Sequence, residues 1–341
     1  MSLVLTVMLA SRNGASVLER TLAAMTRMHE PSGGWKLVAV DNASTDTTSG
    51  ILENYAGKLP LTRLTEPRSG KNHALNRALG EAEGDLFVFC DDDVVAEPDW
   101  LVCWRQVADE HPRYDMFAGV TQPLWPYAPP PWVLEDVDPG IVFAANGHRA
   151  EGPCDALALF GTNMAIRACA FDGGVRFNGD IGPSAAKAYP MGSETELVRR
   201  LAAMGHKSWF ANAPQVQHII RPHQMERISV LARGYRWGRG QAHMRIAHTY
   251  APQRLERKNL LRCSLYPLLM RLYGHKEAWA RQWEWAIDQG YEDGLRECRG
   301  LAARWLLDDG KPRIASRFRN SGPEPLASGS PARRRPQTSD C

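Results

Sequence analysis

The first hundred residues predict an α/β fold in which a mostly parallel sheet is flanked by helices. Short apolar runs with the character of strands alternate there with amphipathic segments of helical period, and polar turn residues follow the apolar runs. Strands that alternate with helices pair in parallel, because each helix carries the chain back across a face of the sheet. Such sheets bind ligands beyond the carboxyl ends of their strands. The polar residues that follow the strands are therefore the first candidates for a functional site.

The individual elements follow from the spacing of apolar residues. Leu3 to Ala10 is predominantly apolar, which is typical of a buried strand, and the turn-forming residues from Ser11 to Gly14 end it. Apolar residues recur at helical spacing from Ser16 to Met28. The same patterns predict a strand within 35–45, a helix within 47–57, a strand at 61–64, a helix within 71–84 and a strand at 86–90.

A carboxylate in the second part of the chain has no evident structural duty. Residues 160–171 have the pattern of a strand, a turn and a helix start. Ser193 and Glu196 fit a Ser-x-x-Glu capping box at the start of a helix that Gly205 ends. This explains Glu196 but not Glu194. Because the helix dipole favours an ionised carboxylate in the first turn, Glu194 is a candidate general base.

The segment from Gln122 to Pro139 contains six prolines and two tryptophans. Proline stiffens the chain, so we expect an ordered surface loop. It is either a simple connector or, through Trp132, part of an aromatic wall for a sugar ring, since an apolar ring face stacks well on tryptophan.

The last part of the chain is expected to be a basic, mostly helical extension. The helical pattern runs from Arg221 to about Leu272, with interruptions at glycines and at Pro267, and a further helix is expected at 277–288. After Lys311 the composition is that of a disordered tail.

Basic residues gather within this extension. Residues 221–262 hold ten Arg and Lys against two acidic residues, a local charge of about +8, whereas the net charge of the whole chain is only +3. The whole protein is therefore not expected to bind nucleic acid. Arg233, Arg236 and Arg239 share a helix face. That face is either solvated, or contacts substrate phosphates, or contacts anionic lipid headgroups.

Composition also narrows the cellular setting. The seven cysteines are odd in number and never form a Cys-x-x-Cys pair, so neither a disulfide framework nor a zinc site is expected. No apolar run reaches the roughly 20 residues of a membrane-spanning helix. We therefore expect a cytoplasmic protein that is soluble or peripheral to the membrane.

Asp91, Asp92 and Asp93 place three carboxylates directly after the strand at 86–90. They are either solvated loop residues or ligands of a divalent cation. The sequence has no glycine-rich phosphate loop, so a nucleotide at the strand ends would need a metal ion to neutralise its phosphates. Mg²⁺ or Mn²⁺ would suit, because such ions take one or two carboxylates and add phosphate and water. In extended backbone, Asp91 and Asp93 would point the same way.

Six segments, in order, resemble family 2 glycosyltransferases, which are inverting, nucleotide-sugar-dependent enzymes with the GT-A fold. These segments are residues 7–25, 37–48, 69–101, 160–167, 191–206 and 214–220. The resemblance covers about Leu3 to Ile220. The expected organisation is a GT-A domain at 1–220 with a nucleotide-binding half at 1–100 and an acceptor and catalytic half at 101–220, then the helical extension at 221–310 and the disordered tail at 311–341.

The resemblance implies how the nucleotide is held. Ser11 and Asp41 line the nucleobase pocket, where Asp41 accepts a hydrogen bond from a uracil-type base, and Lys71 lies near the nucleotide. Asp91 faces the ribose and the metal, and Asp93 is the metal ligand of the Asp-x-Asp motif. Mn²⁺ or Mg²⁺ is therefore the expected cofactor.

It also implies where the reaction takes place. Glu194 stands at the position of the catalytic base, although the Glu-Asp pair of the family is Ser193-Glu194 here. Asn163 lies where the donor and acceptor pockets meet. His218 either approaches the metal or the pyrophosphate, or is a structural residue after a strand. Arg233 replaces the Gln of the Gln-x-x-Arg-Trp motif, so a processive polymer synthase is not expected.

The expected reaction is the inverting transfer of a sugar from a nucleoside-diphosphate sugar, preferably of the UDP type, to a glycan or lipid-linked acceptor in polysaccharide or glycolipid synthesis. Contact of residues 221–262 with an anionic membrane would place the protein at the inner face of that membrane. One alternative is a catalytically silent carbohydrate- or nucleotide-binding protein on the same fold. Another is a haloacid-dehalogenase-type phosphatase with Asp91 as nucleophile, which would need the motif on its first strand.

Overall fold

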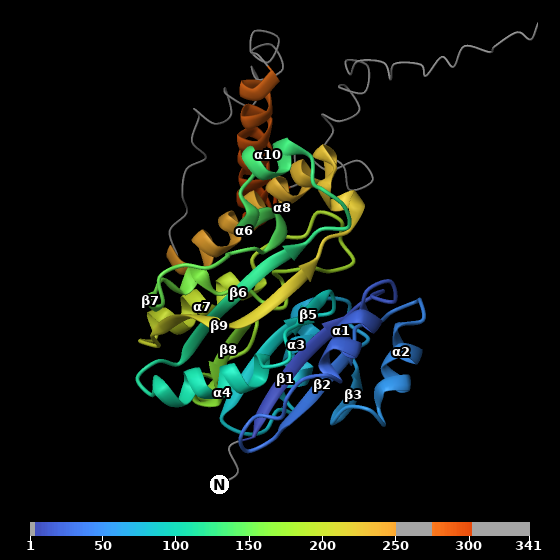
Figure 1. The fold of residues 1–341 in the computed structure, drawn as a ribbon. Coiled ribbons are helices and arrows are strands. Elements are labelled where there is room, and N and C mark those ends of the chain that lie inside the picture. The colour runs from blue at the N-terminus through green and yellow to red at the C-terminus, as the bar shows by residue number, and fades with distance from the viewer. Residues whose placement is uncertain (1–3, 250–274, 302–341) are drawn as a thin grey trace, which may run out of the picture.

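The computed structural model describes residues 4–249 and 275–301 (Figure 1). The tail at 311–341, for which disorder is expected, lies outside these residues, as do residues 250–262 of the basic segment. The division of the chain at 220 and 310 remains a prediction.

The first half of the sheet is parallel. Its strands are β1 (Leu5–Ser11), β2 (Trp35–Asp41), β3 (Leu61–Thr65) and β4 (Leu86–Asp91), and the helices between them are α1 (Leu18–Met25), α2 (Thr48–Tyr55) and α3 (Lys71–Leu79). β1 lies between β2 and β4, and its last two residues pair with Asp41 and Asp91. The polar ends of three strands therefore meet at one edge of the sheet, as the alternation of strands and helices predicts.

The second half of the sheet is mixed. Its strands are β5 (Val94–Ala96), β6 (Met116–Leu124), β7 (Gly152–Cys154), β8 (Met164–Arg167) and β9 (Ser208–Ile219). β8 runs antiparallel to β4 and joins the two halves, while β6 and β9 pair in parallel beyond it. The full order is β3-β2-β1-β4-β8-β6-β9-β5, with β7 beside β9. The expected α/β class is confirmed, and every antiparallel pair among the described residues involves a strand of the second half.

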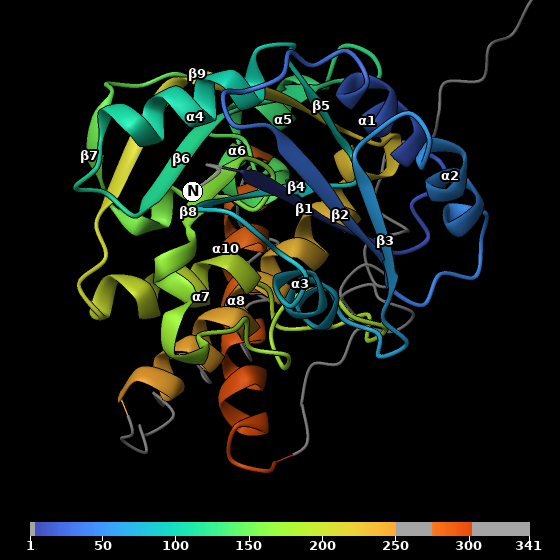
Figure 2. The ribbon, with the colours of Figure 1, turned by 90° about the horizontal axis from the view of Figure 1, so that it is seen from below.

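Helices cover both faces of the sheet (Figure 2). Successive residues of a strand point to opposite faces. In β1, Leu5, Val7 and Leu9 join a core with α1, α2 and α4 (Trp100–Glu110), whereas Met8 joins the core formed with α3 and α7 (Ser193–Ala203). Burial on both faces explains why these strands are almost continuously apolar.

Two long helices, α8 (Arg227–Thr249) and α10 (His275–Glu297), pack against each other and rise from the sheet in Figure 1. The glycines of the first helix were expected to interrupt it, and this expectation is wrong. A Cβ atom at Gly238 would lie 2.0 Å from the carbonyl oxygen of Ile287, and one at Gly290 would lie 1.9 Å from that of Tyr235. These glycines allow two helix backbones to touch, and tertiary packing outweighs their low helix propensity.

A third core holds this helix pair against the proline-rich segment at 122–139. The segment contains α5 (Pro131–Glu135) and leads into α6 (Pro139–Phe143). Val133 and Phe143 are buried there together with Trp279 of α10. The segment is thus ordered, as expected, and its apolar side chains support the C-terminal helices.

Candidate active site

A cavity of about 1330 Å³ opens at the carboxyl ends of the parallel strands, where α/β sheets commonly bind their ligands. The strand ends form one wall, and α7 and α8 contribute to the rest. The residues that line it include Ser11, Asn42, Lys71, Asp91, Asp92, Asp93, Glu194, His218, Arg221, Arg233 and Arg236.

The three adjacent carboxylates have separate partners. β4 ends at Asp91, and Asp92 and Asp93 turn the chain before β5, so the cluster is not extended. Asp91 lies 2.5 Å from Nζ of Lys71, and Asp92 accepts a hydrogen bond of 2.5 Å from Oγ of Ser11. Burial raises the pKa of Asp92 to about 7, with help from the charge of Asp93 and against the Ser11 hydrogen bond.

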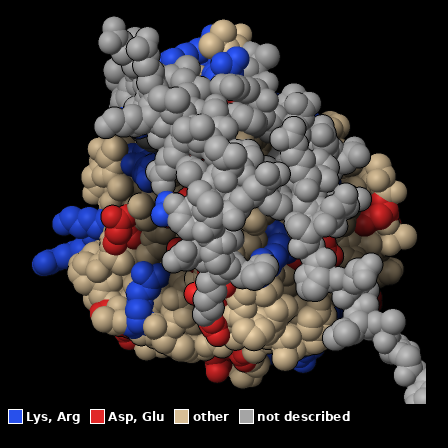
Figure 3. Space-filling model, turned by 90° about the horizontal axis from the view of Figure 1, so that it is seen from above, with Lys and Arg blue, Asp and Glu red and all other residues tan. Residues whose placement is uncertain are grey.

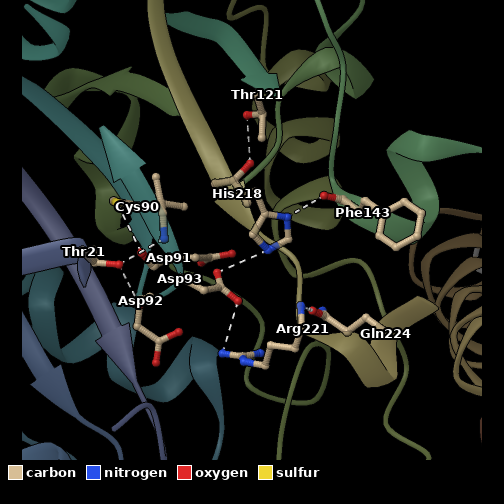
Figure 4. Close-up of polar contacts among 12 residues, drawn as sticks. Thr21, Cys90, Asp91, Asp92, Asp93, Thr121, Phe143, His218, Arg221 and Gln224 are labelled. Atoms are coloured by element: carbon tan, nitrogen blue, oxygen red, sulfur yellow. Dashed lines mark hydrogen bonds and ion pairs between the residues drawn. The ribbon is translucent and has the colours of Figure 1, made fainter. Parts of the chain in front are cut away.

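Asp93 faces His218, near the end of β9, and Arg221, just after that strand (Figure 4). Its carboxylate lies 3.3 Å from Nε2 of His218 and 3.4 Å from Arg221. Burial raises the pKa of Asp93, but His218 and Arg221 outweigh this and hold it below its usual range. Burial lowers the pKa of His218, but Asp93 outweighs this, so the imidazole pKa lies above its usual value.

The donor set around Asp93 suits a divalent cation. Nδ1 of His218 donates to the carbonyl oxygen of Phe143 at 2.6 Å, so in the neutral imidazole the lone pair of Nε2 faces Asp93. Such a carbonyl contact commonly orients a metal-binding histidine. Within residues 4–249 and 275–301, no group of three or more His, Cys, Asp or Glu forms a metal cage. With Asp93 and His218 as protein ligands, substrate phosphate and water would fill the other positions, as is common for Mg²⁺.

A lysine contacts both the aspartate turn, which is residues 91–93, and Glu194, the candidate base. Nζ of Lys71, the first residue of α3, lies 2.5 Å from Asp91 and 2.6 Å from Oε1 of Glu194, and all three side chains are at most 25% exposed. Burial raises the pKa of Glu194, but Lys71 outweighs this, so the pKa lies below its usual value and the carboxylate is ionised. A Cβ atom at Gly161 would lie 2.2 Å from Oε1 of Glu194, so only glycine leaves room for this carboxylate.

The capping box expected at Ser193 and Glu196 is wrong. The helix begins at Ser193 itself, with Gly192 as N-cap and no side-chain cap. The hydroxyl of Ser193 donates to Oδ1 of Asn72, and Glu196 instead pairs with Arg200 at 2.7 Å. Glu194 nevertheless lies in the first turn and faces the cavity, as expected.

The residues expected around the nucleobase lie at the ends of β1 and β2. Ser11 lines the cavity. The carboxylate of Asp41, 9% exposed, accepts a hydrogen bond from the backbone of Ser44 at 3.0 Å and so shapes the loop after β2. Sequence reasoning missed Asn42, which lines the cavity and binds the backbone of residues 66–70 through three hydrogen bonds. Its place directly after a strand is the signal that could have found it.

Two expected pocket residues have structural surroundings. The amide of Asn163 is buried, donates to the carbonyls of Val120 and Pro214 and accepts from the indole of Trp100. Trp132 packs against Trp279 with ring centroids 5.0 Å apart. Neither side chain lines the cavity. The peptide beside Asn163 does, through Gly161 and Thr162.

The basic face of α8 is divided between two environments. Arg233 and Arg236 line the cavity, and Nε of Arg233 donates to the carbonyl of Ile141 at 2.7 Å. Arg239 is 6% exposed and pairs with Glu297 of α10. The interpretation as a solvated face therefore does not hold for these three residues.

Comparison with known sequences agrees with the resemblance. Residues 6–122 match the family model described as glycosyl transferase family 2. Poly(ribitol-phosphate) beta-N-acetylglucosaminyltransferase TarS of Staphylococcus aureus is 30% identical to this chain over 107 residues, which are 31% of this chain and 19% of that protein. The validoxylamine A glucosyltransferase of Streptomyces hygroscopicus subsp. jinggangensis is 29% identical over 99 positions, which are 28% of this chain and 24% of that protein. The chain thus matches about a fifth to a quarter of the length of these relatives.

Comparison with solved structures extends the likeness to most of the chain. The mannosyltransferase PcManGT of Pyrobaculum calidifontis, in complex with GDP-Man and Mn²⁺, superposes with a TM-score of 0.56 at 19% identity and covers 86% of this chain and 87% of that one. Residues 1–349 of S. aureus TarS, in complex with UDP-GlcNAc, superpose with a TM-score of 0.50 at 15% identity and cover 90% of this chain and 95% of that one. At such identities the likeness shows the shared GT-A fold.

Proposed function

We propose that this chain, whose residues 6–122 belong to glycosyl transferase family 2, transfers a sugar from a nucleoside-diphosphate sugar to an acceptor hydroxyl with inversion at the anomeric carbon. One observation carries the proposal: an ionised carboxylate, Glu194, and the Asp93–His218 pair line the same cavity at the strand ends. The first can accept a proton, and the second can hold a cation against a diphosphate.

The donor would lie along the strand ends. The loop after β2, shaped by Asp41 and Asn42, would receive the base. Asp93 and His218 would hold Mn²⁺ or Mg²⁺, and Asp91 would lie near the metal and the ribose. The presence of GDP-Man and Mn²⁺ in one structural neighbour and of UDP-GlcNAc in another supports this class of donor. When bound, the metal would neutralise the charge that develops on the leaving diphosphate.

Glu194 would take the proton from the acceptor hydroxyl as that oxygen attacks the anomeric carbon. A single displacement inverts the configuration, so an α-linked donor gives a β-linked product. A positioned general base contributes typically ~10²–10⁴ in rate. Lys71 holds Glu194 in place and ionised, so it is a positioning residue.

The acceptor is proposed to be a glycan or lipid-linked glycan, as in cell-wall or other polysaccharide synthesis. None of the helices within 4–249 and 275–301 has the length and apolar character to cross a bilayer. Peripheral binding through 221–262 stays a prediction, and it would not use Arg233, Arg236 or Arg239, because the first two line the cavity and Arg239 is buried. Seen from above, described acidic and basic side chains are interspersed (Figure 3). Flotation with anionic liposomes at low and high salt would test the prediction.

The proposal is tested by a thermal-shift screen of UDP, GDP, TDP and ADP, each with Mn²⁺ and with EDTA. Ligand binding to the native state raises the apparent stability, so one nucleotide should raise Tm in the presence of Mn²⁺ only. Turnover of the matching sugar nucleotide would then exclude a silent binding protein. If no nucleotide raises Tm under either condition, the proposed function fails.

A further inference from the structure

The α8 wall of the cavity carries charge that the protein itself does not balance. Arg233 and Arg236 are half-buried and line the cavity from one face of α8. The carboxylates of the protein gather mostly at the opposite wall, where Asp91 and Glu194 share Lys71, and Asp93 has His218 and Arg221.

The two arginines of the described chain that are fully buried are paired with carboxylates. Arg105 pairs with Asp85 and Asp109, and Arg239 pairs with Glu297. In contrast, no carboxylate in the described ranges lies within the 4.0 Å of an ion pair from Arg233 or Arg236. Buried charges are costly without a partner, so a ligand is the natural source of the missing anion.

The surroundings of these two side chains leave donor groups for such an anion. Nε of Arg233 is bound to the carbonyl of Ile141, which anchors the guanidinium by one edge. Arg236 lies over the ring of Tyr189 at 5.2 Å, and its Nε atom is buried without a hydrogen-bond partner. Burial lowers the pKa of Arg233, as expected where no close counter-ion offsets the loss of water. Planar guanidinium groups held in this way match the oxygens of a phosphate.

The cavity is large enough to hold a second ligand at the α8 wall beside a donor at the strand ends. Single-ligand pockets usually have volumes of about 300–1,000 Å³, and this cavity of about 1330 Å³ exceeds that range. A donor at the strand ends would leave the α8 end for the acceptor. Arg199, on α7 beyond Glu194, lines this cavity and also a second one of about 500 Å³, which Lys207 lines too. Basic residues therefore continue along the path by which an extended acceptor would leave the base.

We propose that Arg233 and Arg236 form an anion subsite that binds a phosphate group of the acceptor substrate. This inference rests on the proposed function and deepens it, because it identifies the acceptor as a phosphorylated or phosphodiester-linked molecule. The donor diphosphate has the same chemistry, so the experiment must separate the two sources.

The test uses the full chain, loaded with Mn²⁺ and the nucleoside diphosphate selected by the thermal-shift screen. Glycerol 3-phosphate, and glycerol as the uncharged control, are titrated by calorimetry at low salt. We expect glycerol 3-phosphate to bind the nucleotide-loaded protein and glycerol not to bind. Arg236→Gln should weaken the binding of glycerol 3-phosphate by about tenfold or more, because a charge-assisted contact is lost, and should change nucleotide affinity by less than about threefold.

Arg245→Gln is the matched control, because Arg245 lies on the same helix but is exposed and bonded to Tyr291. It should leave the binding of both ligands unchanged. If glycerol 3-phosphate binds only to nucleotide-free protein, or is displaced by nucleotide, the arginines serve the donor and the inference is overturned. These arms need only the wild-type protein, so they decide the question even if Arg236→Gln does not fold. If no nucleotide binds at all, the proposed function itself has failed.

Discussion

The two walls of the cavity neutralise their charges in opposite ways. At the strand ends, the carboxylates of Asp91, Asp93 and Glu194 each contact a cationic side chain of the protein. On α8, Arg233 and Arg236 have no carboxylate at ion-pairing distance among the described residues. The first wall is thus held in shape by its own contacts, as a catalytic site requires, whereas the second wall is electrostatically complete only with a ligand.

The largest effect is expected from the loss of Asp93, which lies in the cavity wall formed by the strand ends. Asp93→Ala removes the partner of His218 and Arg221 and the expected metal ligand together. Activity should fall by more than the ~10²–10⁴ of a general base, and the Mn²⁺-dependent rise in Tm with nucleotide should disappear. Asp172→Ala, at an exposed carboxylate outside the cavity, is the control. Nucleotide affinity at the wild-type level in Asp93→Ala would contradict the assignment.

The next effect separates chemistry from structure on a single helix. Glu194→Gln keeps the size of the side chain but removes the base, so kcat should fall by ~10²–10⁴ while nucleotide affinity changes little. Glu196→Gln is the matched control, because Glu196 also lies in the first turn of α7 but pairs with Arg200 and does not line the cavity. Single-turnover kinetics and nucleotide titration measure both. Equal losses of kcat in the two variants would exclude Glu194 as the base.

The pH dependence of kcat/KM tests whether Lys71 controls the ionisation of Glu194. Lys71 depresses the pKa of Glu194, so the proposed base should stay ionised down to pH values below the usual carboxylate range. In Lys71→Met the depression is lost, and the acid limb of kcat/KM should move upward by ~1–3 pH units, which is the usual effect of an adjacent opposite charge. An acid limb that stays in place would show that Lys71 does not control the ionisation of Glu194.

The smallest effect concerns the support of the α8 wall. In Gly290→Ala the new Cβ atom would meet the carbonyl oxygen of Tyr235 at 1.9 Å, so the free energy of unfolding should fall by ~1–3 kcal/mol, as in other overpacked sites. Gly50→Ala, in α2 with open space around it, should instead stabilise by ~0.5–1 kcal/mol. Urea denaturation of both variants measures the difference, and equal stabilities would mean that the helices do not pack this closely.

Much of the wall formed by the strand ends could be predicted from the sequence, because the positions of its residues depend on local patterns. Apolar runs fixed the strands, and parallel pairing brought the residues after β1, β2 and β4 to one edge. The contact of Lys71 with Glu194 could not be predicted, because it joins residues 123 positions apart in two different helices.

The errors share one physical cause, which is that tertiary contacts outweighed local preferences. The Ser193 hydroxyl binds Asn72 rather than its own helix. Gly238 sits in a continuous helix because the backbone of α10 passes beside it. The proline-rich sequence favours Trp132 as a wall for a sugar ring, but Trp279, far away in the sequence, packs against it. No pattern within a short window contains such partners.

The pairing of β4 with β8 joins the two halves of the sheet, and the proposed site takes residues from both halves. Residues 6–122, which carry the family signature, include the aspartate turn but neither Glu194 nor His218. The remaining chain supplies those two residues but lacks Lys71 and the four parallel strands β1 to β4. Neither fragment alone contains the complete proposed site. Limited proteolysis between β6 and β8 should therefore abolish turnover unless the two pieces stay associated.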